Sequence, residues 1–319
     1  KIWQYDESLS QSTLYAMDTV MNLTAYGSNA SAALEASVSE INRLDSLLSI
    51  SSEKGEIYRI NADKEGTVSE DVNALLSRSL ELSQMTDGLF DCTIEPVMEA
   101  WGFTTQNFRI PSEEELEELL SHVDYKQVDL ENSAVTIPED VRLDLGGIAK
   151  GFTSSRVMDI FRKNGVTSGI ISLGGNVQAL GHKPDGNMWR VGIQDPHDLN
   201  STFAVVEVAD QAVITSGGYQ RYFEENGQTY HHIIDPRTGY PAENGLISVT
   251  IISADGTLAD ALSTSLFIMG PEEASSFWKK HRDTFDAIMM KDDGTVMVTA
   301  GLADHCSVTT GGNVEVIQE

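Results

Sequence analysis

The sequence predicts an α+β fold in which mixed or antiparallel sheets pack against helices. Short runs rich in β-branched residues are separated by turn residues and are spaced as hairpins. Segments with helical periodicity lie between these runs but do not alternate with them strictly, as a doubly wound parallel sheet would require. At 319 residues, the chain is long enough to bury a substantial hydrophobic core.

Three helices are predicted in the first part of the chain. An apolar stripe over residues 34–48 marks the first helix, with a polar cap among residues 28–31. The second begins at Ser69, carries acidic residues in its first turn and ends near Met85. The third begins at a capping box over residues 112–115, and its acidic run is interpreted as a solvated helix face and not as a metal site.

Most strands are predicted in the second half of the chain, after a first strand over residues 17–26. They cover residues 134–137, 141–145, 169–173, 189–193, 203–208, 212–215, 246–252 and 286–290. Residues 1–16 are polar with a few aromatics and are interpreted as an N-terminal tether, which leaves residues 17–319 as a single domain. A weak internal boundary is expected near residues 126–138.

The charge and the cysteines restrict the classes of function. A formal net charge of −28 argues against nucleic acid and anionic bilayers as partners, because both require a positive surface. Cys92 and Cys306 are far apart and belong to no metal-ligand spacing, so we expect free thiols. No stretch approaches the roughly 18 apolar residues of a transmembrane helix.

Asp260 and Thr264 lie one helical turn apart in a segment with apolar residues at helical spacing. Both side chains therefore project from one face of a helix. A carboxylate and a hydroxyl, completed by water and phosphate oxygens, are ligands that Mg²⁺ takes when it serves a phosphorylated substrate. The alternative is that Asp260 faces solvent and Thr264 only packs its methyl group, since such pairs are common on helices.

A glycine-rich segment over residues 142–151 is interpreted as a strand, a Gly-Gly turn and the start of a helix that continues to about Lys163. Such a turn brings backbone N–H groups close to a phosphate at a helix N-terminus, with Lys150 as the counter-charge. The segment lacks the ending of a Walker A loop and is not a dinucleotide-binding GxGxxG motif. A packing turn without a ligand remains equally open.

His231 and His232 precede a turn on what is predicted to be a strand, so only one of the two can face a given site. A histidine there could take a proton from an incoming hydroxyl near neutral pH. The alternative is a strand histidine whose hydrogen bonds are satisfied in the core.

Seven motifs occur in order along the chain. They are Met17-Asp18-Thr19, Asp87-Gly88-Leu89-Phe90-Asp91, Leu143-Asp144-Leu145-Gly146-Gly147-Ile148-Ala149-Lys150-Gly151, Gly174-Gly175-Asn176-Val177, Ile214-Thr215-Ser216-Gly217-Gly218-Tyr219, His232-Ile233-Ile234-Asp235-Pro236 and Asp260-Ala261-Leu262-Ser263-Thr264. As a set they resemble the FAD:protein FMN transferase family, also called ApbE or flavin-trafficking proteins. The resemblance covers most of the chain, from about Met17 to at least Gly270.

The resemblance implies an α+β enzyme with two lobes and the flavin site between them. Such an enzyme transfers FMN from FAD to a Thr or Ser hydroxyl of an acceptor protein and releases AMP. It implies that Asp260 and Thr264 bind Mg²⁺ together with the backbone of Gly147, and that His232 and Asp260 are the catalytic residues. His231 is then the structural partner of His232.

The resemblance also implies a set of FAD-contacting residues. Asp144, Lys150 and Ile234 would lie on the adenosine side of FAD. The flavin-contacting positions are Met17, Leu89, Phe90 and Asp91. The implied acceptor is a respiratory or electron-transfer flavoprotein subunit. The implied location is extracytoplasmic, with the protein anchored to the cell membrane as a lipoprotein. The membrane contact would be made only by an N-terminal lipid tether that has been removed from this sequence.

Two departures from the family pattern affect the prediction. Asp18 replaces a glycine often seen between the Met and Thr of the first motif. Ser51 stands where an aromatic residue commonly covers the bound dinucleotide, and serine supplies almost no stacking area. Two alternatives therefore remain: a Mg²⁺-dependent FAD pyrophosphatase that gives FMN and AMP, and a flavin-binding lipoprotein without catalysis.

Overall fold

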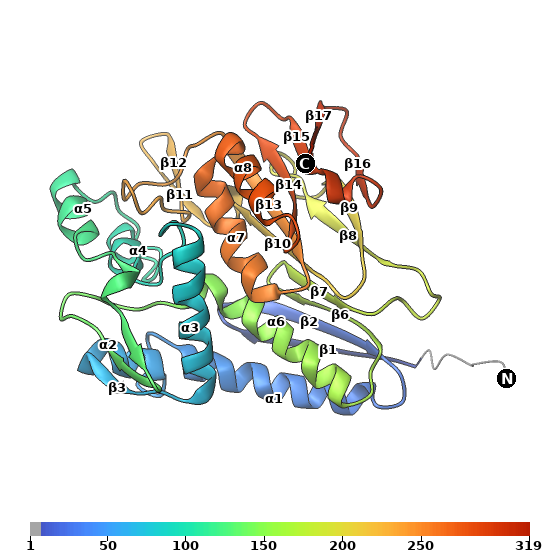
Figure 1. The fold of residues 1–319 in the computed structure, drawn as a ribbon, viewed down its shortest axis with the longest axis horizontal. Helices are drawn as coiled ribbons and strands as arrows, with labels where there is room; N and C mark the ends of the chain where they lie inside the picture. The colour runs from blue at the N-terminus through green and yellow to red at the C-terminus, as the bar shows by residue number, and fades with distance from the viewer. Residues whose placement is uncertain (1–7) are drawn as a thin grey trace.

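The computed structural model describes residues 8–319, and its largest element is a nine-stranded sheet with the order β1-β2-β6-β7-β10-β13-β14-β15-β17 (Figure 1). Its strands are β1 (Leu9–Ala16), β2 (Thr19–Tyr26), β6 (Ser168–Leu173), β7 (Asn176–Leu180), β10 (Ala212–Gly217), β13 (Leu246–Ser253), β14 (Asp286–Lys291), β15 (Val296–Thr299) and β17 (Val314–Ile317). Neighbouring strands pair antiparallel throughout, except that β15 and β17 are parallel.

Three smaller sheets and several helices complete the fold. The small sheets are β16 (Cys306–Val308), β9 (Thr202–Val208) and β8 (Trp189–Gln194); β3 (Glu65–Thr67), β5 (Ala134–Thr136) and β4 (Asp129–Glu131); and β11 (Tyr222–Glu225) with β12 (Gln228–His231). The helices are α1 (Ala30–Leu48), α2 (Glu56–Asp63), α3 (Glu70–Met85), α4 (Glu95–Trp101), α5 (Glu113–Leu120), α6 (Gly146–Lys163), α7 (Gly256–Met269) and α8 (Pro271–His281), with 3-10 turns η1 (Tyr125–Gln127), η2 (Gly218–Gln220) and η3 (Ala300–Leu302).

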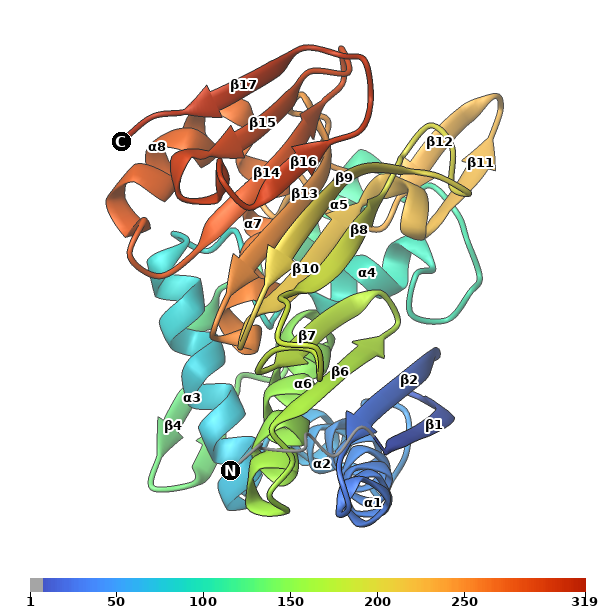
Figure 2. The same ribbon diagram turned by 90° about the vertical axis from the view of Figure 1, so that its right-hand side faces the viewer.

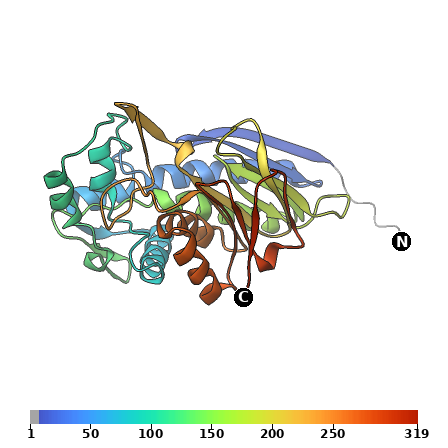
Figure 3. The same cartoon turned by 90° about the horizontal axis from the view of Figure 1, so that it is seen from above.

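Both faces of the large sheet are covered at its centre. Helices α1, α6 and α7 follow one another along one face (Figure 1), and the β8-β9-β16 sheet lies over the other (Figure 2). Ile214 and Ile251 share a core cluster with residues of α7, while the adjacent Val213 and Ile252 share a cluster with residues of β8 and β9. Successive side chains of a strand point to opposite faces, so β10 and β13 are apolar on both. Seen from above, α8 and the β1–β2 hairpin lie on opposite sides of the molecule (Figure 3).

The predicted α+β class is confirmed, and so are the helices that correspond to α1, α3, α5 and α6. The caps differ in detail. Asn29 occupies the N-cap of α1, but its side chain accepts no hydrogen bond from the helix N–H groups, and its amide donates to the carbonyl of Asn164. Ser112 accepts from the N–H of Glu115 as predicted, whereas the Glu115 carboxylate accepts from Arg109. The division into two lobes stays a prediction.

Strand β1 corrects the predicted tether. It pairs with β2 along its whole length, from Leu9 opposite Tyr26 to Ala16 opposite Thr19. β1 is an edge strand, and four consecutive polar residues, 10–13, lie within it. The segment therefore lacks the apolar alternation that would have predicted a strand. Residues 1–7 of the predicted tether lie outside the described residues. The other boundary, near residues 126–138, stays a prediction; that region contains β4 and β5.

The predicted strand over residues 141–145 is wrong. Its backbone is held by a side chain and not by a neighbouring strand: Asn61 Nδ2 donates to the Leu143 carbonyl at 2.8 Å, and Asn61 Oδ1 accepts from the Leu143 N–H at 2.7 Å. Val141, Leu143 and Leu145 are buried, which explains why the segment has the apolar alternation of a strand. The amide of Asn61 supplies both hydrogen bonds that a strand partner would have given.

The sequence patterns did not predict α2, α4 and α8, nor several strands of three to five residues. Such strands carry too few residues to establish a period. Both cysteines are free thiols, as predicted; Cys92 is buried and Cys306 is half-buried. Within residues 8–319, no helix combines the length and the apolar character that crossing a membrane requires.

Candidate active site

Helices α6 and α7 cross at two glycines, and this crossing positions the predicted metal ligands. A Cβ atom on Gly151 would lie 2.1 Å from the carbonyl oxygen of Gly256, and one on Gly256 would lie 2.8 Å from the carbonyl oxygen of Gly151. Only glycine permits this approach of the two backbones. As a result, the N–H of Gly151 donates to Asp260 Oδ2 at 2.8 Å. The first turn of α6 therefore lies against the carboxylate of α7.

The Asp260 side chain is buried, so it does not face solvent. Burial raises the pKa of this carboxyl, against the opposing effects of the Lys150 charge and the Gly151 N–H. One turn further along, the Thr264 hydroxyl lies 3.4 Å from Ser216 Oγ. The structure therefore favours the interpretation that Asp260 and Thr264 form part of one metal site over the alternative that Asp260 faces solvent.

These residues fit a small hard cation. Gly147 lies one helical turn before Gly151, whose N–H donates to Asp260. A carbonyl oxygen has two lone pairs, so the Gly147 carbonyl can accept a hydrogen bond within the helix and still offer a lone pair to a cation. Carboxylate, hydroxyl and carbonyl oxygens are suitable ligands for Mg²⁺. Within the described part of the chain, no cluster of three or more His, Cys, Asp or Glu residues offers a different metal site.

The loop before α6 packs against the second motif. A Cβ atom on Gly147 would lie 3.0 Å from the Phe90 ring, and both Leu89 and Phe90 are buried. Asp144 Oδ1 accepts from the N–H of Gly146 at 2.7 Å, which fixes the entry into the helix. Burial raises the Asp144 pKa, against the effects of that N–H and of the charges of Arg221 and Lys150.

Asp91 has no free carboxylate oxygen. Its Oδ1 accepts from the N–H and the hydroxyl of Thr93, at 2.8 and 2.6 Å, and its Oδ2 accepts from the N–H of Tyr125 at 3.0 Å. These bonds tie the turn before α4 to η1. The structure therefore gives Asp91 a role in shaping the loop that carries Leu89 and Phe90.

The two histidines have different environments. His231 Nε2 lies 3.0 Å from the Ala242 carbonyl and its Nδ1 accepts from the N–H of Ile233, so both ring nitrogens are used. His232 Nδ1 lies 3.1 Å from the Arg221 carbonyl, and no partner within residues 8–319 takes its Nε2. Because a carbonyl only accepts, His232 carries its proton on Nδ1 and has a free lone pair on Nε2. Burial and the Arg221 charge lower the pKa of His232 to about 3.

Lys150 connects these groups electrostatically. Its charge lowers the pKa values of Asp144, Asp260 and His232, which places the ammonium near all three. Within the described residues, the ammonium of Lys150 forms no ion pair or hydrogen bond. The sequence analysis missed a second cation, Arg221, whose charge acts on Asp144 and His232. The available signal was its position two residues after the motif that ends at Tyr219.

Met17 and Ile234 are the first and the last of the predicted FAD-contacting residues along the sequence. Met17 and Asp18 form the β1–β2 turn with φ values of 48° and 58°, a conformation that favours glycine, and Asp is among the residues that tolerate it. The Met17 sulfur lies 3.7 Å from the Thr153 hydroxyl of α6. Ile234 is buried in a cluster that includes Val97. Its contact with the adenosine side of FAD stays a prediction.

Comparison with known proteins identifies the family. The family model described as the ApbE family matches residues 17–289. The FAD:protein FMN transferase of Treponema pallidum is 32% identical over 315 residues, which cover 91% of this chain and 86% of that protein. The chain belongs to the ApbE family. The matched region includes all of the predicted site residues, from Met17 to Thr264, but not β1.

Solved structures of the family share this fold. The ApbE protein of Thermotoga maritima superposes with a TM-score of 0.87 at 32% identity and covers 92% of this chain and 98% of its own. The flavin transferase ApbE of Vibrio cholerae gives a TM-score of 0.82 at 26% identity and covers 93% of this chain and 100% of its own.

The predicted departure from the ApbE pattern lies in an exposed loop. Ser51 follows α1, and its N–H donates to Ser49 Oγ at 3.2 Å. No aromatic ring projects from this position.

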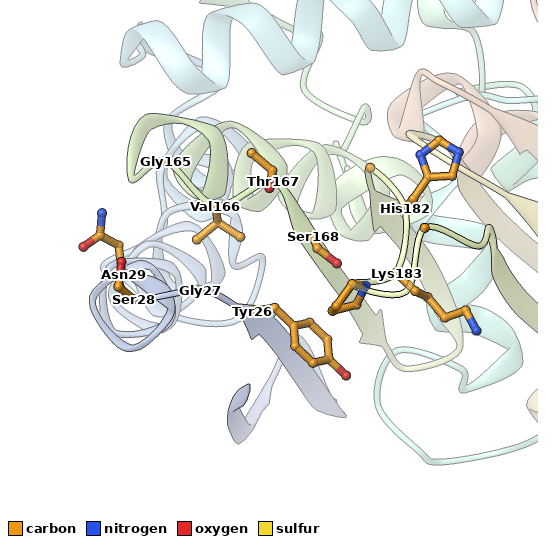
Figure 4. A pocket seen from close by; sticks show the side chains of 13 residues that line it. Tyr26, Gly27, Ser28, Asn29, Gly165, Val166, Thr167, Ser168, His182 and Lys183 are labelled. Carbon is orange, nitrogen blue, oxygen red and sulfur yellow. The ribbon is translucent and has the colours of Figure 1, made fainter. Parts of the chain in front are cut away.

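A separate hollow of about 480 Å³ lies where β2, α1, the end of α6 and the loop after β7 meet (Figure 4). None of the predicted site residues lines it. The side chains of Asn29 and His182 point away from each other (Figure 4).

Proposed function

We propose that this chain transfers FMN from FAD to a Thr or Ser hydroxyl of an acceptor protein and releases AMP, with Mg²⁺ bound at the site. The placement of His232 carries the proposal: one ring nitrogen is fixed, and the other is free near the cation Lys150. Lys150 also lies near the buried carboxylate of Asp260. Relatives named FAD:protein FMN transferases support it.

His232 acts as the general base. Its low pKa keeps the ring neutral at neutral pH, so Nε2 is available to accept the proton of the acceptor hydroxyl. The hydroxyl oxygen forms a bond to the phosphorus of the FMN phosphate as the pyrophosphate bond to AMP breaks. AMP leaves with the bridging oxygen and its electron pair, and the proton resides on His232 Nε2.

Asp260, Thr264 and the carbonyl of Gly147 are the groups that would hold Mg²⁺. When bound, the ion would polarise the pyrophosphate and neutralise part of its charge. On the protein side, Lys150 and Asp144 lie on the adenosine side of FAD together with Ile234. Met17, Leu89 and Phe90 contact the flavin, and Asp91 holds their loop in place through its three hydrogen bonds.

A FAD pyrophosphatase is the second candidate, favoured by the exposed Ser51. Without an aromatic cover, water could replace the acceptor hydroxyl at the same phosphorus and give free FMN and AMP. We expect Ser51→Tyr to suppress AMP release in the absence of acceptor, because an aromatic ring adds stacking area. The neighbouring exposed residue gives the control, Ser52→Tyr. Equal AMP release by the three proteins would contradict the role of the loop.

One experiment separates the candidates. The protein is incubated with FAD and Mg²⁺, with an acceptor that carries a target Thr or with the same acceptor carrying Val there, and FMN, AMP and acceptor-bound FMN are quantified by mass. AMP with FMN bound only to the Thr acceptor supports the transferase. AMP and free FMN with either acceptor make the protein a pyrophosphatase. Intact FAD throughout leaves a flavin-binding protein and overturns both enzymes.

The acceptor and the location form part of the proposal. A respiratory or electron-transfer flavoprotein subunit would supply the target hydroxyl. The protein would act outside the cytoplasm, anchored as a lipoprotein. Fractionation of cells with detergent, followed by mass spectrometry of the N-terminal peptide, tests the anchor.

A further inference from the structure

Arg221 is a cation without a carboxylate partner in the described part of an acidic protein. The chain has 49 acidic and 21 basic residues. Arginines elsewhere in the fold, such as Arg43, Arg142 and Arg156, form ion pairs with nearby carboxylates. Within residues 8–319, Arg221 forms none, and it is exposed. Arg190 also lacks such a partner within these residues, so the missing ion pair alone identifies no ligand. Arg221 differs because it lies next to the predicted active site, where an anionic ligand would supply the partner of its charge.

The backbone of Arg221 holds the predicted general base. Its carbonyl accepts from the main-chain N–H and from Nδ1–H of His232, both at 3.1 Å. Its Nη2 donates to the Phe103 carbonyl at 2.5 Å, and the Phe103 ring contacts the His232 ring at a centroid distance of 6.3 Å. The guanidinium is thereby held beside His232, and its remaining N–H groups have no partner within the described residues.

We propose that Arg221 binds the pyrophosphate of FAD together with Lys150 and neutralises the negative charge that the departing AMP acquires. The inference rests on the proposed function and assigns a residue to the same site. The fork of a guanidinium can donate two parallel hydrogen bonds to phosphate oxygens, whereas the ammonium of Lys150 acts as a point charge. As the pyrophosphate bond breaks, its electron pair passes to the bridging oxygen of AMP, close to both cations.

The test uses Arg221→Gln and Arg221→Lys, with Arg190→Gln as the matched control. Arg190 is also exposed and has no carboxylate partner in the described part of the chain, but it lies on β8, outside the predicted site. FAD binding is titrated by flavin fluorescence at low and high salt, with AMP and inorganic pyrophosphate as competitors. We expect Arg221→Gln to weaken the binding of FAD and both competitors roughly tenfold to hundredfold and to reduce the salt dependence. The Lys variant should recover part of the loss, and the control should match the wild type.

The pH dependence of transfer gives a second measurement. The charged and titratable groups around His232 are Arg221, Lys150 and His231. Removing the Arg221 charge should raise the pKa of His232 and move the acid limb of kcat/KM to higher pH, while the carbonyl bond to Nδ1 persists. A purely structural role would lower the rate without moving this limb.

Unchanged FAD affinity and salt dependence in a folded Arg221→Gln protein would overturn the inference. If that variant does not fold, Arg221→Lys provides the test, because it keeps the positive charge but loses the forked guanidinium. Wild-type affinity of Arg221→Lys for pyrophosphate would exclude the two parallel hydrogen bonds. Binding is measured without an acceptor, so a wild-type protein that binds FAD but labels no acceptor disproves the proposed function and leaves the role of Arg221 testable.

Discussion

Gly151→Ala tests the helix crossing on which the site depends. The new Cβ would lie 2.1 Å from the Gly256 carbonyl oxygen, whereas even a close C···O contact needs about 3.3 Å. Helices α6 and α7 would have to separate by about 1 Å. Overpacking of this kind costs roughly 1–3 kcal/mol, and stretching the charged hydrogen bond from Gly151 to Asp260 adds roughly 1.5–3 kcal/mol. The better helix propensity of alanine returns only about 1 kcal/mol.

We therefore expect Gly151→Ala to lower the free energy of unfolding by about 2–4 kcal/mol and to weaken Mg²⁺ binding. Denaturant unfolding with and without Mg²⁺ measures both effects. Gly311→Ala is the control, because no atom lies within 4 Å of its new Cβ. If Gly151→Ala unfolds within about 0.5 kcal/mol of the wild type, the crossing tolerates a side chain and the reasoning is refuted.

Three further predictions concern single residues. His232→Gln should lower transfer roughly a hundredfold or more, while His231→Gln, which loses two structural hydrogen bonds, should mainly lower stability; equal kinetic losses would contradict their separate roles. Asp260→Asn should stabilise the metal-free protein at neutral pH and abolish its stabilisation by Mg²⁺. Because the pKa of Asp260 is raised in the folded protein, its contribution to stability is fully present below about pH 3.8 and is lost as the pH rises through the raised pKa. The Asn variant should therefore show a smaller decline in the free energy of unfolding with pH, measured by urea unfolding. Asn61→Ala should cost about 2–4 kcal/mol by leaving both Leu143 backbone groups unpaired; a loss below about 1 kcal/mol would mean that water replaces the amide.

Local patterns predicted those features whose cause is local. The spacing of Asp260 and Thr264 places them on one helix face, and Ser69 and Ser112 mark the starts of α3 and α5. The apolar alternation over residues 141–145 correctly predicts burial but not pairing, because the partner is a single amide distant in sequence. A periodic pattern reports which side chains are buried, and it does not report what satisfies the backbone.

Tertiary contacts account for the parts of the site that the sequence could not supply. From the sequence alone, the glycine-rich segment that ends at Gly151 fits a phosphate-binding turn and a packing turn equally well. Only the position of Gly256 shows that Gly151 allows α6 and α7 to pack closely. Arg221 contributes through its carbonyl, which has no sequence signature, and through a charge that forms no ion pair within residues 8–319. The sequence motif selects His232 over His231, whereas the structure explains the choice by the partner of each ring nitrogen.

The low pKa of His232 has a consequence for catalysis. A base with a pKa of about 3 holds a proton weakly and is inefficient at removing one from an alcohol. Bound FAD changes this, because its pyrophosphate brings negative charge next to Lys150 and Arg221, whose fields depress the pKa. The pKa of His232 should therefore rise when FAD binds. Since kcat/KM reports the free enzyme and kcat the complex, the acid limb of kcat should lie at higher pH than that of kcat/KM. If the acid limbs of kcat and kcat/KM coincide, the phosphates of bound FAD do not lie close enough to Lys150 and Arg221 to change the pKa of His232.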